Sequence, residues 1–423
     1  MTDFDSLDFF TDESVLADPH PYFEHLRAQC PVQPTAHYGV VAVTGYDEAG
    51  EVYRDNEHFS ACNTVFGPFT PYPVPLEGDD ITETLEDSHD QLPSSDLFAT
   101  MDPPRHNRER GLLMRLMTPK RLSENEEFMW RLADEHLDDA LAGGRCEFIA
   151  DYARPYTLLV IADLLGVPRE HYQMFREGFR LSAAASSNSN APVEQNSLSW
   201  VYGYFAEYVE ERRRHPRGDV LTQLAQAKYP DGSMPEVMAV VHVAAFLFAT
   251  GQETTVRLLS SALWYLAEFP ELQDELRADR ARIPNFIEEC LRMDSPIKSD
   301  FRMTKRTTTL NGVTLTAGTP VAIFNGAANR DPGRFECPHE FRVDRPNVRE
   351  HIAFGRGIHS CPGASLARSE GRVTVERILS RTRDIRFAEE HHGPAGDRRF
   401  EYEPNWLIRA LHELHLEFTP VDG

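Results

Sequence analysis

The sequence lacks an apolar run long enough to cross a lipid bilayer. The longest run, MAVVHVAAFLFAT from Met238, is shorter than the roughly 20 residues that a membrane-spanning helix needs. The opening residues, MTDFDSLDFF, also lack the pattern of a signal peptide, because they are acidic where such a peptide is basic and then apolar. These two absences predict a soluble, cytoplasmic protein without a membrane anchor.

Positive charge and cysteine are both scarce. The 43 Lys and Arg residues face 67 Asp and Glu residues, and the formal net charge of -24 argues against nucleic acid as a partner. The six cysteines are scattered along a long chain, which does not suit a disulfide framework and favours a reducing compartment. They are Cys30, Cys62, Cys146, Cys290, Cys337 and Cys361.

Internal repeats and long linkers are lacking as well. At about 150 residues per domain, the 423 residues alone allow two or three domains. However, no linker divides the chain, and its 41% hydrophobic content is enough for one large core. We therefore expect a single domain over residues 1–423.

Helices account for most of the expected secondary structure. A longer helix is expected between a capping-box pattern at Ser233 and Glu236 and a stop at Pro270. Amphipathic spacing of three and four residues predicts further helices over residues 122–143, 151–167, 199–214 and 364–379.

Strands are a minority, so the fold class is mainly α with a small β region. Residues 307–324 alternate as strands do, with a turn at Asn311 and Gly312, and residues 406–418 are the second candidate. Two irregular stretches interrupt the helices. Such long loops are more often functional or mobile than accidental, and they cover residues 60–104 and 182–197.

One cysteine has unusual surroundings. In the stretch HIAFGRGIHSCPGASLAR, residues 351–368, Cys361 and Pro362 lie at the N-terminal end of an expected helix that begins at Ala364. Unpaired amides and the positive end of the helix dipole stabilise a thiolate over a thiol. Because a thiolate is a metal ligand, Cys361 is a candidate for that role.

Gly251 lies in the middle of the long expected helix, where glycine costs about 1 kcal/mol relative to alanine. Close packing against another helix would explain it, and is the simpler interpretation. The alternative is a local widening beside a ligand. In that case one helical face would line the ligand site with Phe246, Ala249, Thr250 and Thr254.

Two charged patterns are ambiguous by themselves. Glu289 and Arg292 lie one turn apart on a helix, and such a pair is usually solvated and worth a few tenths of a kcal/mol. A basic cluster stands out in the acidic chain and indicates a charged helix face, an internal anion ligand or an acidic partner. It contains Arg105, Arg108, Arg110, Arg115, Lys120 and Arg121.

Two histidine patterns do not meet the requirements of a metal motif. His412 and His415 are three residues apart, whereas the zinc helix of a metalloprotease needs His-Glu-x-x-His, and the region is an expected strand. His391 and His392 lie in a polar loop. Both pairs are therefore interpreted as ordinary surface.

Taken in order along the chain, four motifs closely resemble those of the cytochrome P-450 family. They are His106-x-x-x-Arg110, the stretch ATGQETT over residues 249–255, Glu289-x-x-Arg292, and a cysteine loop with Phe354, Gly357, Cys361 and Gly363. Residues 328–347 also resemble the segment that leads into the cysteine loop in soluble members of the family. The resemblance covers most of the chain.

The resemblance implies a triangular helical prism that binds one haem b between a long central distal helix and the helix after the cysteine loop. Cys361 would be the axial thiolate of the iron. Haem contacts are implied for Phe354, Gly363 and Ala249, and the propionates would be bound by His106, Arg110, Arg302 and His359. Glu289 and Arg292 would be structural, with Arg345 as a candidate third member.

The implied activity is a monooxygenase reaction that inserts one atom of O2 into a C–H bond or a double bond. Thr254 and Glu253 resemble the alcohol and acid that relay protons in this family. The hydroxyl of Thr250 is either a spare hydrogen-bonding group or bonded back to its own helix. A peroxygenase that uses hydrogen peroxide and a haem-thiolate gas sensor are the alternatives, and the intact Glu253 and Thr254 pair speaks against both.

The implied substrate is lipophilic, such as a terpenoid, a steroid or a fatty-acid-like molecule. Lys298 could anchor a carboxylate, although an exposed lysine is the simpler interpretation. The implied pocket positions are Leu97, Phe98, Phe246, Ala249, Thr250, Ile297 and Leu407.

Electrons are expected from a separate ferredoxin and its reductase, since the chain shows no fused reductase or ferredoxin segment. An acidic ferredoxin would meet the basic cluster, with Arg356 and Arg368 near it. The protein itself is expected to be a monomer.

Overall fold

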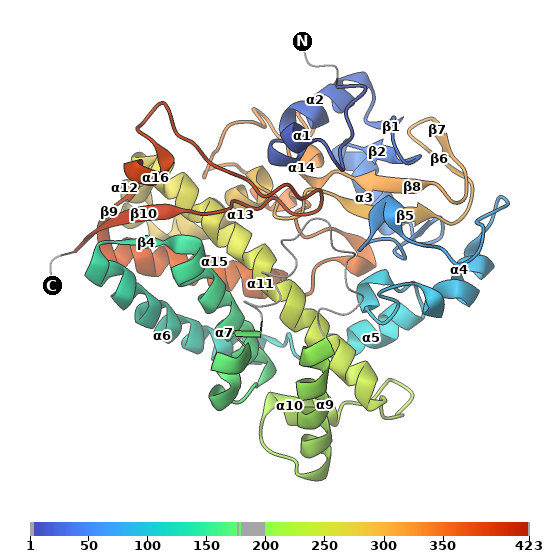
Figure 1. Ribbon diagram of the computed structural model, residues 1–423, viewed down its shortest axis with the longest axis horizontal. Coiled ribbons are helices and arrows are strands. Elements are labelled where there is room, and N and C mark those ends of the chain that lie inside the picture. Colours follow the sequence, from blue (N-terminus) through green and yellow to red (C-terminus); the bar gives the residue numbers. More distant parts are fainter. Residues whose placement is uncertain (1–3, 176, 179–198, 422–423) are drawn as a thin grey trace.

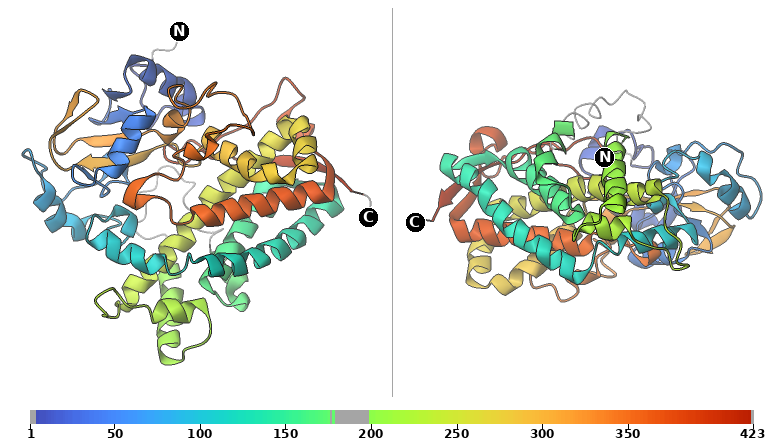
Figure 2. Two further views of the ribbon diagram at one scale, coloured as in Figure 1. Left: turned by 180° about the vertical axis from the view of Figure 1, so that it is seen from behind. Right: turned by 90° about the horizontal axis from the view of Figure 1, so that it is seen from below.

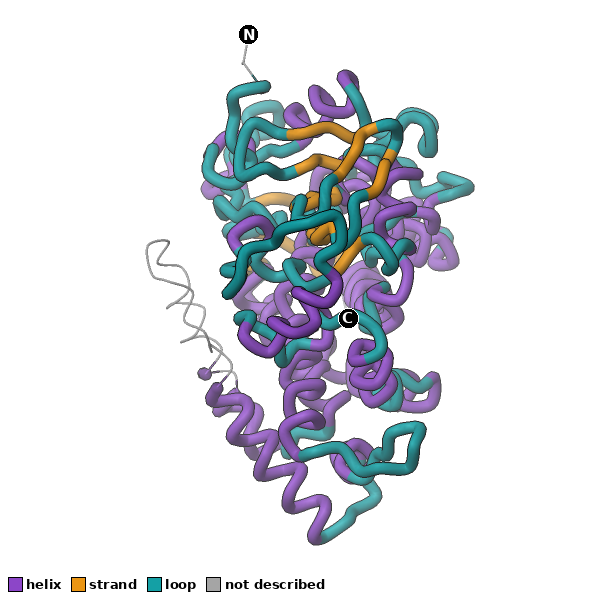
Figure 3. Tube along the Cα trace, turned by 90° about the vertical axis from the view of Figure 1, so that its right-hand side faces the viewer, coloured by secondary structure: helices purple, strands orange, loops and turns teal. Residues whose placement is uncertain are grey.

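The computed structural model describes residues 4–175, 177–178 and 199–421 of the chain. The irregular stretch expected over residues 182–197 lies outside the described residues. Many of the strands gather at one end of the molecule and long helices at the other (Figure 3), but one small sheet packs among those helices.

Helices make up most of the described chain, as expected. Four long ones form the helical half: α6 (Pro119–Gly143), α9 (Ser199–Arg214), α11 (Val237–Glu268) and α15 (Ala364–Arg381). The remainder are α1 (Glu13–Ala17), α2 (His20–Gln29), α3 (Tyr46–Arg54), α4 (Thr82–Ser88), α5 (Arg105–Leu113), α7 (Arg154–Leu165), α10 (Val220–Ala225), α12 (Pro270–Ala278), α13 (Ile283–Met293), α14 (Asn325–Ala328) and α16 (Glu389–His392).

Three small sheets account for the strands. The largest has the order β1 (Val32–Pro34), β2 (Val41–Val43), β8 (Pro320–Ile323), β5 (Asp300–Thr304) and β3 (Phe59–Ser60). A second contains β4 (Arg145–Glu147), β10 (His415–Pro420) and β9 (Thr382–Phe387). The third is the hairpin of β6 (Thr308–Leu310) and β7 (Val313–Leu315), whose turn residues Asn311 and Gly312 have the expected positive φ values of 47° and 78°.

The helix α11 runs diagonally through the middle of the molecule (Figure 1). It packs against α5, α7, α9, α13 and α15, and α15 lies beside α6 (Figure 2). By length and composition alone α11 could cross a membrane. Most of its side chains are instead buried against neighbouring helices, which is the arrangement of a core helix.

Several local expectations are wrong. The stretch 60–104 is not irregular throughout, because it contains α4 and three 3-10 turns. His391 and His392 lie in α16 rather than in a loop, and His392 is buried.

The capping box at Ser233 does not form, because the Ser233 hydroxyl donates to Asp231 Oδ1 (2.6 Å) in a tight turn, and α11 begins after Glu236 without a side-chain cap. The strand expected over residues 406–418 is confirmed only from His415 onward. Its first half makes isolated bridges, Ile408 with Ile297 and Leu411 with Tyr402.

Candidate active site

The cysteine loop owes its shape to backbone contacts and to glycine. The Cys361 amide donates to the Phe354 carbonyl oxygen (2.8 Å), which closes the loop before α15 begins. Gly357 has a φ of 69°, and a Cβ atom there would lie 2.2 Å from the Tyr53 carbonyl oxygen. Any larger side chain at residue 357 would therefore push α3 away from the loop.

The Cys361 thiol lies among amides and cations, but much of its surroundings is protein. Burial raises the pKa of the thiol, and this effect outweighs the Gly363 and Ala364 amides and the charges of Arg110 and Arg368, which lower it. The expected contribution of the amides at the start of α15 is present, but it is smaller than the effect of burial. A metal cation bound at sulfur deprotonates a coordinating thiol outright. The rest of the stabilisation of the Cys361 thiolate therefore has to come from the bound metal.

Three buried nitrogen atoms meet beside this loop without a hydrogen-bond partner among the described residues: His106 Nε2, Arg110 Nη1 and His359 Nε2. The His106 and His359 rings are 4.1 Å apart between centroids, although one belongs to α5 and the other to the 3-10 turn Gly357–His359. Arg110 uses its second nitrogen, Nη2, to donate to the Ser360 carbonyl oxygen (2.6 Å).

The electrostatics of this cluster favour an anionic ligand. Burial and then the charges of Arg302, His106 and Arg110 lower the pKa of His359 to about 2, and burial also lowers the pKa of His106. Neutral imidazoles and two arginines therefore face one another. Because a buried donor without a partner costs roughly 1–3 kcal/mol, carboxylate oxygens such as those of haem propionates fit this cluster chemically.

Arg302 is near this cluster but already has partners. Its Nη1 donates to Asp300 Oδ1 (3.1 Å), to Thr64 Oγ1 (2.9 Å) and to the Phe301 carbonyl oxygen (2.6 Å). Its charge reaches both histidines, whose pKa values it lowers. Of the four residues implied as propionate partners, Arg302 is the one whose charge the protein itself compensates.

The middle of α11 carries a stripe of partly exposed residues on an otherwise buried helix. Phe246, Ala249, Thr250 and Thr254 belong to it and recur at helical spacing. The Thr250 hydroxyl donates to the Phe246 carbonyl oxygen (2.8 Å), and the Thr254 hydroxyl to that of Thr250 (2.9 Å). The Thr250 hydroxyl was expected to be either a spare hydrogen-bonding group or bonded back to its own helix. The structure shows the second arrangement.

Gly251 is explained by packing. The helix α11 is continuous from Val237 to Glu268. A Cβ atom at Gly251 would lie 3.4 Å from Ile161 Cδ1 of α7, at the short end of ordinary van der Waals contact. The described helix has no local widening there, so the simpler interpretation of Gly251 holds.

Glu253 belongs to a network that sequence reasoning missed. Its Oε2 accepts a hydrogen bond from Arg257 Nη2 (2.6 Å), and its Oε1 lies 3.4 Å from Arg154 Nε. Arg257 also donates to Glu403 Oε1 (3.4 Å). The spacing of four between Glu253 and Arg257 was a usable signal, whereas Arg154 and Glu403 are remote in sequence.

Several of the implied pocket residues do lie close together. The rings of Phe98 and Phe246 meet edge to face with centroids 4.6 Å apart, and half-buried Leu97 precedes Phe98. Ile297 forms a bridge with Ile408 beside Leu407. The structure thus forms two apolar groups from residues far apart in the chain.

Both interpretations of Lys298 are wrong. The side chain is only 2% exposed, and its Nζ donates to the Leu16 carbonyl oxygen (2.7 Å), so it neither faces solvent nor reaches into the pocket. Burial lowers the pKa of its ammonium group to about 7. Lys298 instead ties α1 to the core.

Glu289 and Arg292 form a fully buried ion pair rather than a solvated one. Arg292 Nε and Nη2 donate to the two carboxylate oxygens of Glu289, both at 2.7 Å, and Arg345 Nε donates to the same carboxylate at 3.1 Å. Arg292 also donates to the Asn329, Pro338 and Glu340 carbonyl oxygens. The three side chains therefore join α13 to the segment that leads into the cysteine loop.

The basic cluster does not form one surface. Arg105 pairs with Asp90 (2.6 Å), Arg110 faces the cysteine loop, and Arg121 donates to the Leu164 carbonyl oxygen of α7 (3.1 Å). The exposed members are Arg105, Arg108, Arg115 and Lys120.

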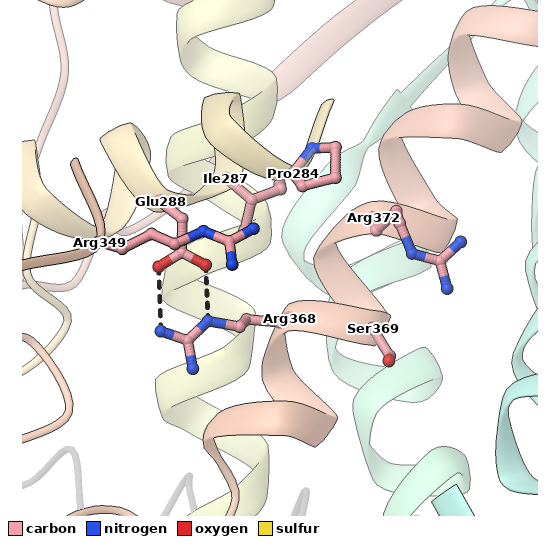
Figure 4. A pocket seen from close by; sticks show the side chains of 7 residues that line it. All are labelled: Pro284, Ile287, Glu288, Arg349, Arg368, Ser369 and Arg372. Atoms are coloured by element: carbon pink, nitrogen blue, oxygen red, sulfur yellow. Dashed lines mark hydrogen bonds and ion pairs between the residues drawn. The ribbon is translucent and has the colours of Figure 1, made fainter. Parts of the chain in front are cut away.

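A second group of cations surrounds a pocket of about 390 Å³ between α13 and α15 (Figure 4). Arg368 donates to both carboxylate oxygens of Glu288 (2.6 and 2.9 Å), and its Cζ lies 4.6 Å from the Phe354 ring centroid. Exposed Arg349 and half-buried Arg372 complete the cationic rim. This pocket is therefore adjacent to the cysteine loop.

Comparison with known proteins places these motifs in one family. The cytochrome P450 family model matches residues 195–383. Cytochrome P450 144 of Mycobacterium tuberculosis is 34% identical over 97% of this chain and 91% of its own length.

Solved structures agree with the sequence relatives. Substrate-free CYP150A6 of Mycobacterium marinum is 55% identical, covers 99% of this chain and 100% of its own, and has a TM-score of 0.94. CYP109E1 of Bacillus megaterium in complex with corticosterone is 27% identical, covers 96% and 99%, and has a TM-score of 0.80.

The protein belongs to the cytochrome P450 family. It has the fold of that family and is a haem-thiolate monooxygenase that binds haem b. The predicted family, fold class, cofactor and class of enzyme are thus confirmed.

Proposed function

We propose that this monooxygenase inserts one atom of O2 into a lipophilic small molecule with electrons from a separate ferredoxin and its reductase. The second oxygen atom leaves as water after two electrons and two protons are taken up. The observation that carries the proposal is a group of three buried nitrogen atoms beside the Cys361 loop, which have no hydrogen-bond partner among the described residues. They belong to His106, Arg110 and His359. We also propose a monomeric, single-domain protein of the cytoplasm.

Cys361 would bind the haem iron through Sγ. The amides of Gly363 and Ala364 lower the pKa of its thiol and so favour the charge on sulfur. Haem, when bound, supplies the oxygen chemistry, and thiolate ligation favours O–O cleavage. His106, Arg110 and His359 would bind its propionates, with Arg302 as an electrostatic neighbour, and Phe354, Gly363 and Ala249 would contact the ring.

Thr254 and Glu253 are the proposed members of the proton relay: Thr254 would position a water, and Glu253 would supply protons. The Thr254 hydroxyl holds its proton at Oγ1 against the Thr250 carbonyl oxygen, which leaves the lone pairs of Oγ1 free to accept from a water. The Glu253 carboxylate is partly exposed and so can exchange protons with solvent, while Arg257 and Arg154 determine its position.

Replacing Thr254 by alanine should uncouple electron use from product. Without Oγ1 near the reacting oxygen, protons arrive at the wrong atom and oxygen leaves as hydrogen peroxide. NADH consumption with redox partners should continue while product per NADH falls and peroxide rises. The Thr250→Ala variant is the matched control, because it removes a hydroxyl with the same kind of bond back to the helix, here to the Phe246 carbonyl oxygen, from a residue outside the proposed proton relay. Unchanged coupling in Thr254→Ala would mean that this hydroxyl is not required.

The substrate class follows from the apolar residues around the proposed pocket. Phe98, Phe246, Ile297 and Leu407 offer hydrophobic contact, which suits a terpenoid, steroid or fatty-acid-like molecule. The similar CYP109E1 has been solved with corticosterone, which favours testing steroids early. Optical titration of the haem band with members of the three classes tests this assignment. A response confined to small charged compounds would contradict it.

Product formation distinguishes the proposed reaction from that of a peroxygenase. We expect product to form faster with NADH, a ferredoxin and its reductase than with hydrogen peroxide alone. Faster turnover with peroxide alone would favour the peroxygenase.

The cations near the cysteine loop form the proposed docking surface for an acidic ferredoxin. A chain with a net charge of -24 repels such a partner unless it offers a local positive patch. Arg349 and Arg368 lie beside the pocket in Figure 4, and Arg115 is exposed after α5. Charges within about 8 Å of the partner are felt at physiological ionic strength.

Reversing Arg115 or Arg349 to glutamate should slow the first electron transfer by up to about tenfold at low salt, since steering is electrostatic. Its salt dependence should weaken, while dithionite reduction and substrate binding stay normal. Stopped-flow reduction by ferredoxin measures the rate. Arg399→Glu is the control, because it makes the same charge change on an exposed residue after α16. Rates indifferent to both reversals would place the docking surface elsewhere.

A further inference from the structure

The start of β10 and the turn after β9 bring together three side chains with metal-ligating atoms. His391 belongs to α16, His415 is the first residue of β10, and Glu413 lies two residues before it. Their ligand atoms all lie within 4.8 Å of one another. The sequence motif for a zinc helix does not apply to them, because one ligand comes from a turn and two from extended chain.

The backbone around His415 is fixed on both sides. Its amide donates to His392 Nε2 (2.8 Å), and its carbonyl oxygen accepts from the Ala388 amide (3.0 Å). His392 is buried, and its Nδ1 lies 3.3 Å from the Arg399 carbonyl oxygen. Since Nε2 of His392 accepts, its proton is on Nδ1, and the ring is a support rather than a ligand.

The extended chain places Glu413 and His415 on the same side. Residues i and i+2 of a strand share a face, and the intervening Leu414 is fully buried. The Leu414 amide donates to Glu147 Oε1 (2.7 Å), which fixes this register. His415 Nε2 lies 3.1 Å from Glu413 Oε2, so both ligand atoms meet at one point outside the sheet.

His391 completes the group from the other side. Its ring stacks on that of His415 with centroids 3.6 Å apart and planes 9° apart. Glu390 Oε1 lies 3.4 Å from its Nε2 and also pairs with Arg145 (3.0 Å). Because a ring nitrogen binds a metal in the plane of its ring, His391 has to turn out of the stack on binding. It is exposed and can do so.

We propose that His391, Glu413 and His415 bind a divalent first-row transition metal ion, with Zn²⁺ as the ion to test. Two imidazoles and one carboxylate suit Zn²⁺, whereas Ca²⁺ and Mg²⁺ require oxygen ligands. Water completes the coordination. The site is separate from the haem site and independent of the proposed monooxygenase reaction.

The ion would tie together the two ends of a long surface segment. Residues 393–412 leave the sheet after α16 and return at Glu413. The segment carries Leu407 and also Glu403, which accepts from Arg257 of α11 (3.4 Å). A metal ion that joins the two ends of such a long loop restricts their motion. Metal binding should therefore stabilise the arrangement of Glu403 and Leu407.

Isothermal titration calorimetry of tag-free, haem-loaded protein with ZnCl2 tests the proposal. We expect one saturable site with a dissociation constant below about 10 μM, in the range expected for three protein ligands. His391→Ala and Glu413→Gln should each weaken binding at least tenfold. His412→Ala is the matched control: it is exposed and adjacent in sequence but outside the group, and it should bind as the wild type does.

Two results would overturn the proposal. One is the absence of saturable 1:1 binding tighter than about 100 μM. The other is an equal effect of His412→Ala and His391→Ala, which would indicate unspecific coordination by surface histidines. Since His391 is exposed, its alanine variant should fold, and an unchanged haem spectrum checks this before each titration.

Discussion

Cys361→Ser is expected to abolish product formation with NADH and redox partners. Serine keeps the size of the side chain but replaces a soft sulfur ligand by an alcohol that does not donate charge as a thiolate does. The Cys361 amide still bonds to the Phe354 carbonyl oxygen, so the loop should keep its shape. Product formation and bound haem per chain, measured together, separate lost chemistry from lost cofactor.

Serine at two other cysteines provides the controls. Cys62 is buried near Tyr72, and Cys337 is exposed on the segment before the loop. Neither belongs to the cysteine loop or to the group of His106, Arg110 and His359, so both variants should retain haem and turnover. Normal turnover by Cys361→Ser would contradict the assignment of this residue.

Glu289→Ala is expected to lower the free energy of unfolding by about 3–5 kcal/mol. The change removes the carboxylate that compensates Arg292 and Arg345, and both guanidinium groups would remain buried. Because Arg292 also bonds to backbone oxygens before the cysteine loop, haem should be released at a lower denaturant concentration. Urea denaturation followed by circular dichroism and by the haem band measures both effects.

An exposed ion pair provides the comparison. Glu57 lies 2.9 Å from Arg306, and 70% of its side chain is exposed. Glu57→Ala should leave the unfolding curve nearly unchanged, because exposed pairs contribute little. If Glu289→Ala were as mild as Glu57→Ala, the buried pair would have no structural role.

The secondary structure was predictable where one periodicity dominates. The helices α6, α9 and α15 and the β6–β7 turn follow from apolar spacing and from the Asn311 and Gly312 pair. The start of α11 was not predictable, because the Ser233 hydroxyl donates to Asp231 instead of capping the helix. The strand expected from Trp406 begins only at His415, since pairing partners decide where a strand forms.

The motifs of the candidate site were recognisable in the sequence, but the contacts between them were not. Cys361, His106, Arg110 and His359 came from the resemblance, and no spacing rule places α5 beside the cysteine loop. Lys298 was misjudged because the Leu16 carbonyl oxygen that binds it is remote in sequence. The proximity of His391, Glu413 and His415 was not predicted for the same reason. It arises from the pairing of β9 and β10, which are remote in sequence.

The absorption spectrum of the ferrous carbon monoxide complex tests most directly whether Cys361 supplies a thiolate to haem. Thiolate ligation shifts the main band to longer wavelength than nitrogen or oxygen ligation does. The account predicts this red-shifted band for the wild type and for Cys62→Ser and Cys337→Ser, and its loss in Cys361→Ser. A Cys361→Ser protein that retained the red-shifted band would contradict it.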